Sequence, residues 1–191
     1  MTKKVFGLLI IGVMIAIVVA GYVKENVDQE DSIAAEQQGV DLIGVTAKEG
    51  LNKGDVAPDF ELTTLDGNNI RLSELKGKKV ILNFWASWCG PCRDEMPHMQ
   101  KYYEDFAQDE NVEILAVNLT SGDRLKNVES FIDDYSLTFP IPMDTKGEIG
   151  KTYQAITIPT SYMIDTNGRI QNKIVGPMDE SMIKKLVTNL N

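Results

Sequence analysis

Both cysteines of the 191-residue chain lie within residues 88–92, which read Trp-Cys-Gly-Pro-Cys. If a helix begins at Cys89, then Cys92 lies one turn further along the same face, where the two sulfur atoms can form a disulfide. A ring that encloses only two intervening residues removes little entropy from the unfolded chain, so it would contribute little as a structural crosslink. The spacing therefore favours a redox couple that opens and closes.

The elements that must position this pair follow from the hydrophobic pattern around it. Residues 80–85 form a nearly continuous apolar run, which predicts a central strand covered on both faces that leads into the cysteine motif. A helix is expected from the motif to about residue 108, and a second buried strand over residues 112–119. The pair should therefore lie at a junction between a strand and a helix.

Two turn signals predict hairpins in the rest of the domain. Asp66-Gly67 lies within a hairpin expected over residues 60–72, and Asn167-Gly168 lies within another over residues 162–175. Hydrophobic periodicity predicts the remaining elements, which are helices over residues 125–135, near 149–153 and over 182–190, and a short strand at 139–143. No internal repeat interrupts this order.

The order of these elements predicts the fold class. Strands alternate with helices in the first half of the domain, and a hairpin followed by a helix closes the chain. Such an order predicts an α/β fold with a mixed, mainly parallel central sheet and helices on both faces. Chemistry in these folds gathers at the carboxyl ends of strands, which is where the cysteine motif would lie.

The N-terminal segment predicts a membrane anchor. Lys3 and Lys4 precede residues 5–23, which carry no charge and would span about 28 Å as a helix, close to the hydrocarbon thickness of a bilayer. Lysines on one side and an acidic stretch on the other predict a single-pass protein of the cell membrane whose domain lies outside the cytoplasm. A cleaved signal peptide is the alternative, with Val18-Val19-Ala20 as a passable cleavage site.

Composition divides the chain into four parts and excludes some partners. The parts are a cytoplasmic stub (1–4), the anchor (5–23), a polar tether (24–53) and a folded domain (54–191). The net charge of −9 argues against nucleic acid as a partner. We expect the protein to be a monomer. Two cysteines this close together in an exported domain fit a disulfide-exchange site.

The two cysteines should have different roles in thiol–disulfide exchange, which needs a thiolate that attacks and a second thiol that resolves the mixed disulfide. Cys89 should attack, because unpaired amides and the dipole at the helix start favour a negative sulfur. Pro91 fits the first helical turn, where a missing N–H costs nothing. Cys92, one turn inside the helix, should be more buried and should resolve.

The segment that contains the two cysteines resembles that of a known family. Residues 83–92 (NFWASWCGPC) resemble the active-site segment of the thioredoxin superfamily. The anchor, residues 57–60 (APDF) and residues 91–97 (PCRDEMP) resemble the extracytoplasmic ResA/TlpA/CcmG-like thiol-disulfide oxidoreductases, most of all the ResA and StoA types. The resemblance covers about residues 55–190. It implies a thioredoxin-like fold with a strand–helix insertion, and reduction of disulfides in exported proteins.

The resemblance also assigns roles to residues around the pair. Pro159 matches the loop proline that is cis in this superfamily and faces the cysteines, although an ordinary trans proline is the default for an X-Pro bond. Ile158 would then offer backbone groups to a substrate peptide. Trp88 would shield the thiolate and contact partner proteins, with simple packing as the alternative.

Two polar positions bear on proton transfer. Glu95 matches the acidic residue that tunes the cysteine pair in ResA-like proteins, although a solvated first-turn carboxylate is the simpler interpretation. Asn83 stands where cytoplasmic thioredoxins have a buried Asp, and an amide cannot relay a proton, which makes Glu95 a better candidate carrier. The Gly90-Pro91 dipeptide is the one found in thioredoxin, whose couple lies at about −270 mV, and it predicts a reductant.

No cofactor beyond the Cys89–Cys92 disulfide is expected. The chain has no dinucleotide-binding fingerprint, so electrons must come from another protein, which the resemblance implies is a membrane thiol carrier of the CcdA or DsbD type. The client could be apocytochrome c, during cytochrome c maturation, or a cell-wall or spore-cortex enzyme. A metal site is not expected, because His98 is the only histidine and structural zinc needs four well-spaced ligands.

Two other functions compete with this one. A peroxiredoxin-like thiol peroxidase also begins with the APDF run, but its signature places Pro and Thr or Ser where this chain has Leu82 and Ala86. A Sco-type metallochaperone spaces its cysteines by three residues and uses a distant histidine, and neither feature occurs here. A disulfide reductase therefore remains the leading hypothesis.

Overall fold

The computed structural model describes residues 48–190. The predicted anchor (5–23) and most of the predicted tether lie outside these residues. Within the described part of the chain, no helix combines the length and the apolar character needed to cross a membrane.

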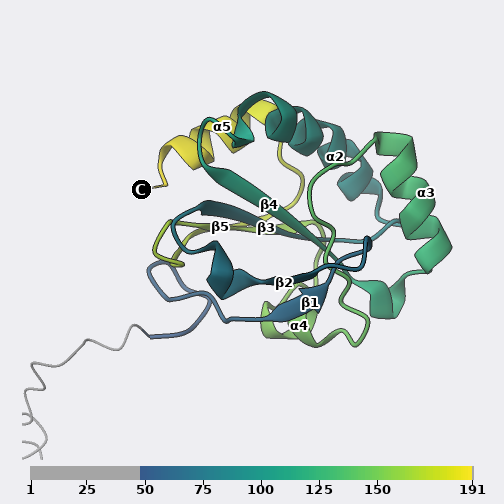
Figure 1. Cartoon of the computed structure of the whole chain (residues 1–191), viewed down its shortest axis with the longest axis horizontal. Coiled ribbons are helices and arrows are strands. Elements are labelled where there is room, and N and C mark those ends of the chain that lie inside the picture. The colour runs from purple at the N-terminus through teal and green to yellow at the C-terminus, as the bar shows by residue number, and fades with distance from the viewer. Residues whose placement is uncertain (1–47, 191) are drawn as a thin grey trace, which may run out of the picture. The chain divides into compact units, whose positions relative to one another are not determined.

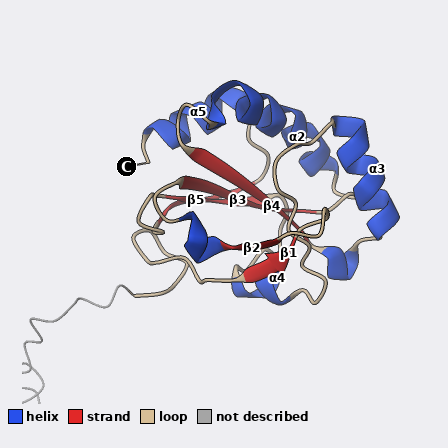
Figure 2. Cartoon of the chain, in the orientation of Figure 1, coloured by secondary structure: helices blue, strands red, loops and turns tan. Residues whose placement is uncertain are grey.

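The described domain combines strands and helices, which Figure 2 colours red and blue. In chain order they are β1 (Glu61–Thr63), β2 (Asn69–Arg71), β3 (Lys79–Trp85), α2 (Gly90–Tyr102), β4 (Val112–Asn118), α3 (Leu125–Tyr135), α4 (Glu148–Thr152), β5 (Thr160–Ile164), β6 (Ile170–Val175) and α5 (Glu180–Thr188). A π-helical turn, Tyr103–Ala107, extends α2 to the end that the sequence predicts.

The expected hairpins both form. Strands β1 and β2 pair antiparallel across a turn in which Gly67 has a φ of 88°, a left-handed conformation that glycine adopts without strain. Strands β5 and β6 pair antiparallel across the turn at Gly168, whose φ is 77°. Local turn chemistry therefore predicts these two features correctly.

The central sheet is mixed, with strand order β4-β3-β5-β6. Its prediction as mainly parallel is wrong, because only β3 and β4 pair in parallel, while β3–β5 and β5–β6 are antiparallel. The reason lies in residues 137–144, which run beside β4 in the same direction after α3 has brought the chain back. This extra pass returns the chain to the carboxyl end of the sheet, so β5 enters from that end.

Residues 139–143 accordingly differ from the predicted short strand. They form an extended segment that contacts β4 through an isolated bridge between Asn118 and Met143, and the first hairpin through one between Thr64 and Pro142. The segment thus joins the hairpin to the sheet without extending a regular ladder.

Helices α2, α3 and α5 pack on one face of the sheet, and the β1–β2 hairpin and α4 lie on the other (Figure 1). Alternation along β3 supplies both cores, because Ile81 and Trp85 face the three helices while Leu82 and Phe84 face the hairpin and α4. Trp85 is fully buried, as expected. The strand that leads into the cysteine motif is therefore fixed by packing on both sides.

The folded domain begins before the predicted boundary at residue 54. The N–H of Val56 donates to the carbonyl of Lys48 at 2.9 Å, and the N–H of Gly50 donates to the carbonyl of Val56 at 3.0 Å. Residues 48–53 therefore belong to the domain and not to the tether, because backbone pairing with the segment around Val56 holds them there.

Candidate active site

Cys89 and Cys92 form a disulfide at the start of α2, with their Cα atoms 5.3 Å apart. Cys89 is the N-cap residue, and its Sγ accepts a hydrogen bond from the N–H of Cys92 at 3.2 Å. Pro91 occupies the first helical turn. The strand–helix junction thus places Cys89 where helix amides can stabilise a negative sulfur.

The two cysteines differ in what surrounds them. Cys92 is fully buried, whereas Cys89 retains slight exposure and lies between two exposed residues, Trp88 and Gly90. A partner sulfur can therefore approach Cys89 and not Cys92. This geometry is that of an attacking and a resolving cysteine.

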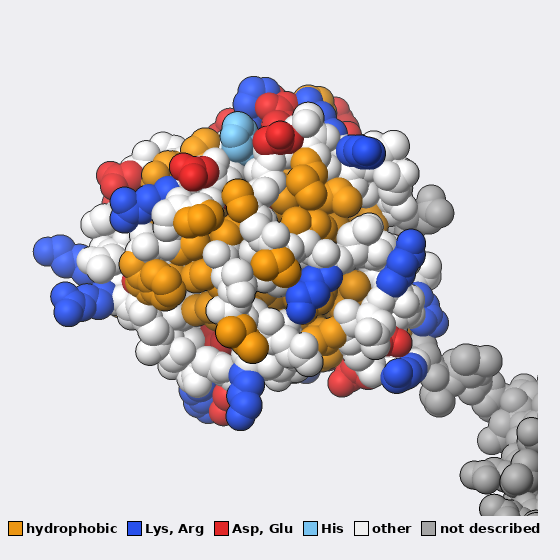
Figure 3. All heavy atoms as spheres, turned by 180° about the vertical axis from the view of Figure 1, so that it is seen from behind, with side chains coloured by type: hydrophobic (Ala, Val, Ile, Leu, Met, Phe, Trp, Pro, Cys, Tyr) orange, Lys and Arg blue, Asp and Glu red, His pale blue; other side chains and the backbone are white. Residues whose placement is uncertain are grey.

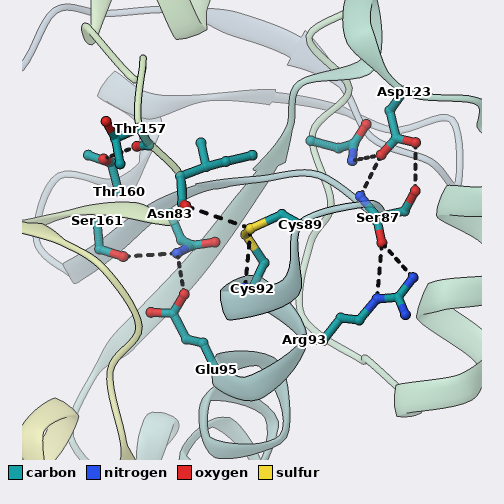
Figure 4. The surroundings of a disulfide bond; sticks show 12 residues. Asn83, Ser87, Cys89, Cys92, Arg93, Glu95, Asp123, Thr157, Thr160 and Ser161 are labelled. Carbon is teal, nitrogen blue, oxygen red and sulfur yellow. Dashed lines mark hydrogen bonds between the residues drawn. A yellow bond between two sulfur atoms is a disulfide. The ribbon is translucent and has the colours of Figure 1, made fainter.

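The loop before β5 faces the pair. The Ile158–Pro159 peptide bond is cis, as the resemblance implied. The carbonyl oxygen of Ile158 lies 3.7 Å from Cys89 Sγ, and the Thr160 hydroxyl donates to the carbonyl of Thr157 at 2.6 Å and closes the loop (Figure 4). The backbone of Ile158 therefore lies next to the sulfur atom of Cys89.

Glu95 is fully buried in α2, so the solvated interpretation of this carboxylate is wrong. Burial raises the pKa of Glu95 to about 7, and two hydrogen bonds oppose that rise in part. Its Oε1 accepts from the N–H of Met178 at 3.3 Å, and its Oε2 accepts from Nδ2 of Asn83 at 3.2 Å. A carboxyl group with this pKa can exchange protons near neutral pH.

Asn83 connects the strand to this carboxyl group. Its Nδ2 also donates to Oγ of Ser161 in β5, at 2.9 Å. Sequence reasoning identified Asn83 only as a residue unable to relay a proton, and missed Ser161 and Met178. Only the register of β3 with β5, which places Asn83 opposite Ser161, could have indicated the first contact.

A second polar cluster holds the active-site loop from the other side. Oδ2 and Oδ1 of Asp123 accept hydrogen bonds from the N–H and hydroxyl of Ser87, each at 2.6 Å, and Asn118 Nδ2 donates to Oδ2 at 3.1 Å. Partial burial raises the pKa of Asp123, but these bonds and one from the N–H of Arg124 outweigh it and hold the pKa below its usual value. Asp123 therefore clamps the loop as an anion.

Trp88 and Arg93 complete this side of the site. The indole N–H of Trp88 donates to the carbonyl of Gly122 at 2.9 Å, while 60% of the residue stays exposed, so a simple packing role does not fit. Arg93 donates to the carbonyl of Ser87 from Nε at 3.3 Å and from Nη2 at 3.1 Å. No pattern in the sequence indicates Asp123, Ser87 or Arg93 as parts of the site.

His98 lies on the exposed side of α2. Across residues 48–190, no three or more His, Cys, Asp or Glu side chains are grouped as metal ligands. The chemistry visible in the described domain is that of the cysteine pair and its polar neighbours.

Comparison with known proteins decides the family. The AhpC/TSA family model matches residues 53–173. Thioredoxin-like protein YneN of Bacillus subtilis (strain 168) is 45% identical over 137 residues, 71% of this chain and 79% of that protein. Thiol-disulfide oxidoreductase ResA of the same organism is 40% identical over 136 residues, 71% and 74% of the two chains. The crystal structure of StoA from Bacillus subtilis has a TM-score of 0.61 at 39% identity, covering 69% of this chain and 97% of that one.

The chain belongs to the AhpC/TSA family and to the ResA- and StoA-type thiol-disulfide oxidoreductases. The α/β fold with its mixed sheet is thioredoxin-like, and the enzyme carries its redox-active pair at Cys89 and Cys92. In this oxidoreductase the buried carboxyl group of Glu95 and the clamp at Asp123 lie on separate sides of the pair (Figure 4).

Replacing Glu95 with Gln should make the stability of the oxidoreductase less dependent on pH. The folded-state pKa of Glu95 is raised to about 7, so the folded form keeps a proton that the unfolded form releases, and stability falls as pH rises from about 4.5 to 7. From pH 4 to pH 8, the free energy of unfolding of Glu95→Gln should therefore rise by about 3 kcal/mol relative to that of the parent protein.

Denaturant unfolding of the disulfide form measures this shift, because disulfide cysteines do not titrate. Glu129→Gln, at an exposed position of α3, is the matched control and should follow the parent protein at every pH. If the free energy of unfolding depended on pH in the same way in Glu95→Gln and in the parent protein, an uncharged, buried Glu95 below pH 7 would be contradicted.

Removing the clamp should slow exchange more than it harms folding. Asp123→Ala leaves the N–H and hydroxyl of Ser87 without their acceptor and should lower the free energy of unfolding by about 2 kcal/mol. Because the loop that carries Cys89 then samples other conformations, its reaction with a disulfide should slow several-fold. Stopped-flow kinetics checks this, with partial rescue by Asp123→Asn and no effect from exposed Asp133→Ala. Unchanged kinetics in Asp123→Ala would refute the clamp.

Proposed function

We propose that this thiol-disulfide oxidoreductase reduces disulfides in exported proteins, from a position tethered to the outer side of the cell membrane. The observation that carries the proposal is the asymmetry of the pair. Cys89 is slightly exposed and lies next to Ile158, whereas Cys92 is fully buried on the helix that also carries the buried Glu95. Lys3, Lys4 and the apolar residues 5–23 support the membrane location.

The first step forms a mixed disulfide with the client. The thiolate of Cys89, stabilised by the N–H of Cys92 and the start of α2, attacks one sulfur of a client disulfide. The bond between the two client sulfurs breaks, and one of them leaves as a thiolate. The backbone of Ile158, next to Cys89 Sγ, is placed to hold the client segment during this step.

The second step releases the reduced client. Cys92 transfers its proton to the carboxylate of Glu95 and attacks Cys89 Sγ, which forms the Cys89–Cys92 disulfide and expels the second client thiolate. Two electrons have then passed from the enzyme to the client. A membrane thiol carrier of the CcdA or DsbD type would supply two electrons through its own dithiol and restore the reduced pair.

Exposed apolar side chains around the pair support a protein client. Trp88 adjoins Cys89 and is 60% exposed, Ile156 in the loop before Pro159 is 93% exposed, and Val175 pairs with Thr160 and is 57% exposed. Figure 3 shows hydrophobic side chains gathered across one face of the domain. Apocytochrome c and cell-wall or spore-cortex enzymes are the clients that we propose.

Trapping the mixed disulfide tests the mechanism in cells. Cys92→Ala in the full chain removes the resolving thiol, so Cys89 should accumulate in covalent adducts with clients, visible on non-reducing gels and lost with reductant. Cys89→Ala is the matched control and should form none. Equal adduct levels in the two variants would contradict Cys89 as the attacking residue.

The match to the AhpC/TSA family model favours one competing function, a thiol peroxidase. Leu82 and Ala86, both fully buried, occupy the positions where that signature has Pro and Thr or Ser. With dithiothreitol as electron donor, the purified enzyme should reduce a peptide disulfide and leave hydrogen peroxide unconsumed. Peroxide turnover that depends on Cys89 would replace the reductase proposal with the peroxidase.

The membrane location has its own test. Immunoblots of cell fractions should find the full-length chain with membranes, and deletion of residues 1–23 should move it to the cytoplasm, because the lysines and the apolar run are then missing. A shortened, freely soluble product from the full-length gene would show instead that the segment is a cleaved signal peptide.

A further inference from the structure

Asn83 carries a buried polar atom that the two steps of thiol–disulfide exchange do not use. Asn83 is fully buried, and its Nδ2 has two acceptors, but its Oδ1 has no hydrogen-bond partner within residues 48–190. Buried side-chain oxygens nearly always have a donor, since leaving one without a partner destabilises the fold. The orphaned oxygen therefore needs an explanation.

The position of Asn83 fixes where this oxygen points. Residues 81, 83 and 85 of β3 share one face, and Ile81 and Trp85 belong to the same core as both cysteines. Glu95 and Ser161 hold the nitrogen of the planar amide, so the oxygen is turned away from them. In Figure 4 the oxygen points toward the sulfur atoms of the Cys89–Cys92 pair.

The structure shows the disulfide form, in which neither sulfur carries a hydrogen to donate. Reduction adds two electrons and two protons to the pair, and the S–H of the buried Cys92 becomes a donor on this face of β3. We propose that Asn83 is a positioning residue whose Oδ1 accepts a hydrogen bond from the thiol of Cys92 in the dithiol form.

This hydrogen bond would have two effects on the reaction. It exists only in the dithiol form, so it shifts the equilibrium of the pair toward that form. It also orients the Cys92 thiol beside an amide whose nitrogen already binds Glu95. Asn83 takes no proton itself. The inference requires only a redox-active pair, and does not depend on the client or on the direction of electron flow.

Infrared spectroscopy can detect the bond directly. The chain has two cysteines, so Cys89→Ala contains a single thiol, that of Cys92. Alanine, unlike serine, adds no hydroxyl group that could form a hydrogen bond with this thiol. At mildly acidic pH its S–H stretching band should lie at the lower wavenumber of a hydrogen-bonded thiol. Adding Asn83→Leu removes the acceptor and should move the band to higher wavenumber.

Two further variants separate this role from a general change in packing. In the Cys89→Ala background, Asn83→Asp keeps an acceptor oxygen at the same place, and Ser161→Ala removes only a partner of Nδ2. Both should leave the band at low wavenumber. Asn83→Ala replaces the leucine variant if circular dichroism shows that the latter does not fold. If the S–H stretching band of Cys92 keeps the same wavenumber when Asn83 is replaced by Leu or Ala, the proposal is overturned.

Redox equilibrium gives a second, independent readout. With both cysteines present, Asn83→Leu should shift the equilibrium with dithiothreitol toward the disulfide by about three- to tenfold, because the dithiol form loses a hydrogen bond. The shift should persist in a Glu95→Gln background, since the acceptor acts on Cys92 and not through the Glu95 charge. An unchanged equilibrium, or one shifted toward the dithiol, would refute the role of Asn83.

Discussion

A carboxyl group buried between the central sheet and the active-site helix is the constraint on which this site depends. Glu95 cannot hold its charge there without donors, and the two that it has come from distant parts of the chain, the amide of Asn83 in β3 and the N–H of Met178 after β6. Each donor requires its segment to lie in one place. One side chain therefore connects α2, β3 and the segment that leads into α5.

The reactive sulfur sits where this buried cluster meets two loops from other parts of the chain. The loop before α3 holds Ser87 through Asp123, and the loop with cis-Pro159 brings the carbonyl of Ile158 to Cys89. Neither loop contributes an ionisable group to the sulfur itself. The Asp123 loop holds the segment that carries Cys89 in place, so that the charge developing on sulfur meets the N–H of Cys92.

The sequence predicts the parts of the site that depend on neighbouring residues. Cys89 and Cys92, the strand that precedes them and the hairpin turn at Gly67 all follow from spacing and turn chemistry. The contact of Asp123 with Ser87 joins residues 36 positions apart, and that of Met178 with Glu95 joins residues 83 apart. No local pattern encodes such distances. The prediction of a mainly parallel sheet is wrong for the same reason, because the direction of β5 depends on how often the chain crosses the sheet before it.

Burial of Cys92 limits how the enzyme can choose among partners. A donor and a client must both react at Cys89, since the other sulfur is enclosed by the core and by the polar cluster at Asn83. The chemistry at sulfur is then the same for both partners, so it cannot tell them apart. Under the proposed function, discrimination rests on exposed apolar side chains, those of Trp88 next to Cys89 and Ile156 in the loop before Pro159. That proposal assigns selectivity and reactivity to different residues, so that either can change without loss of the other.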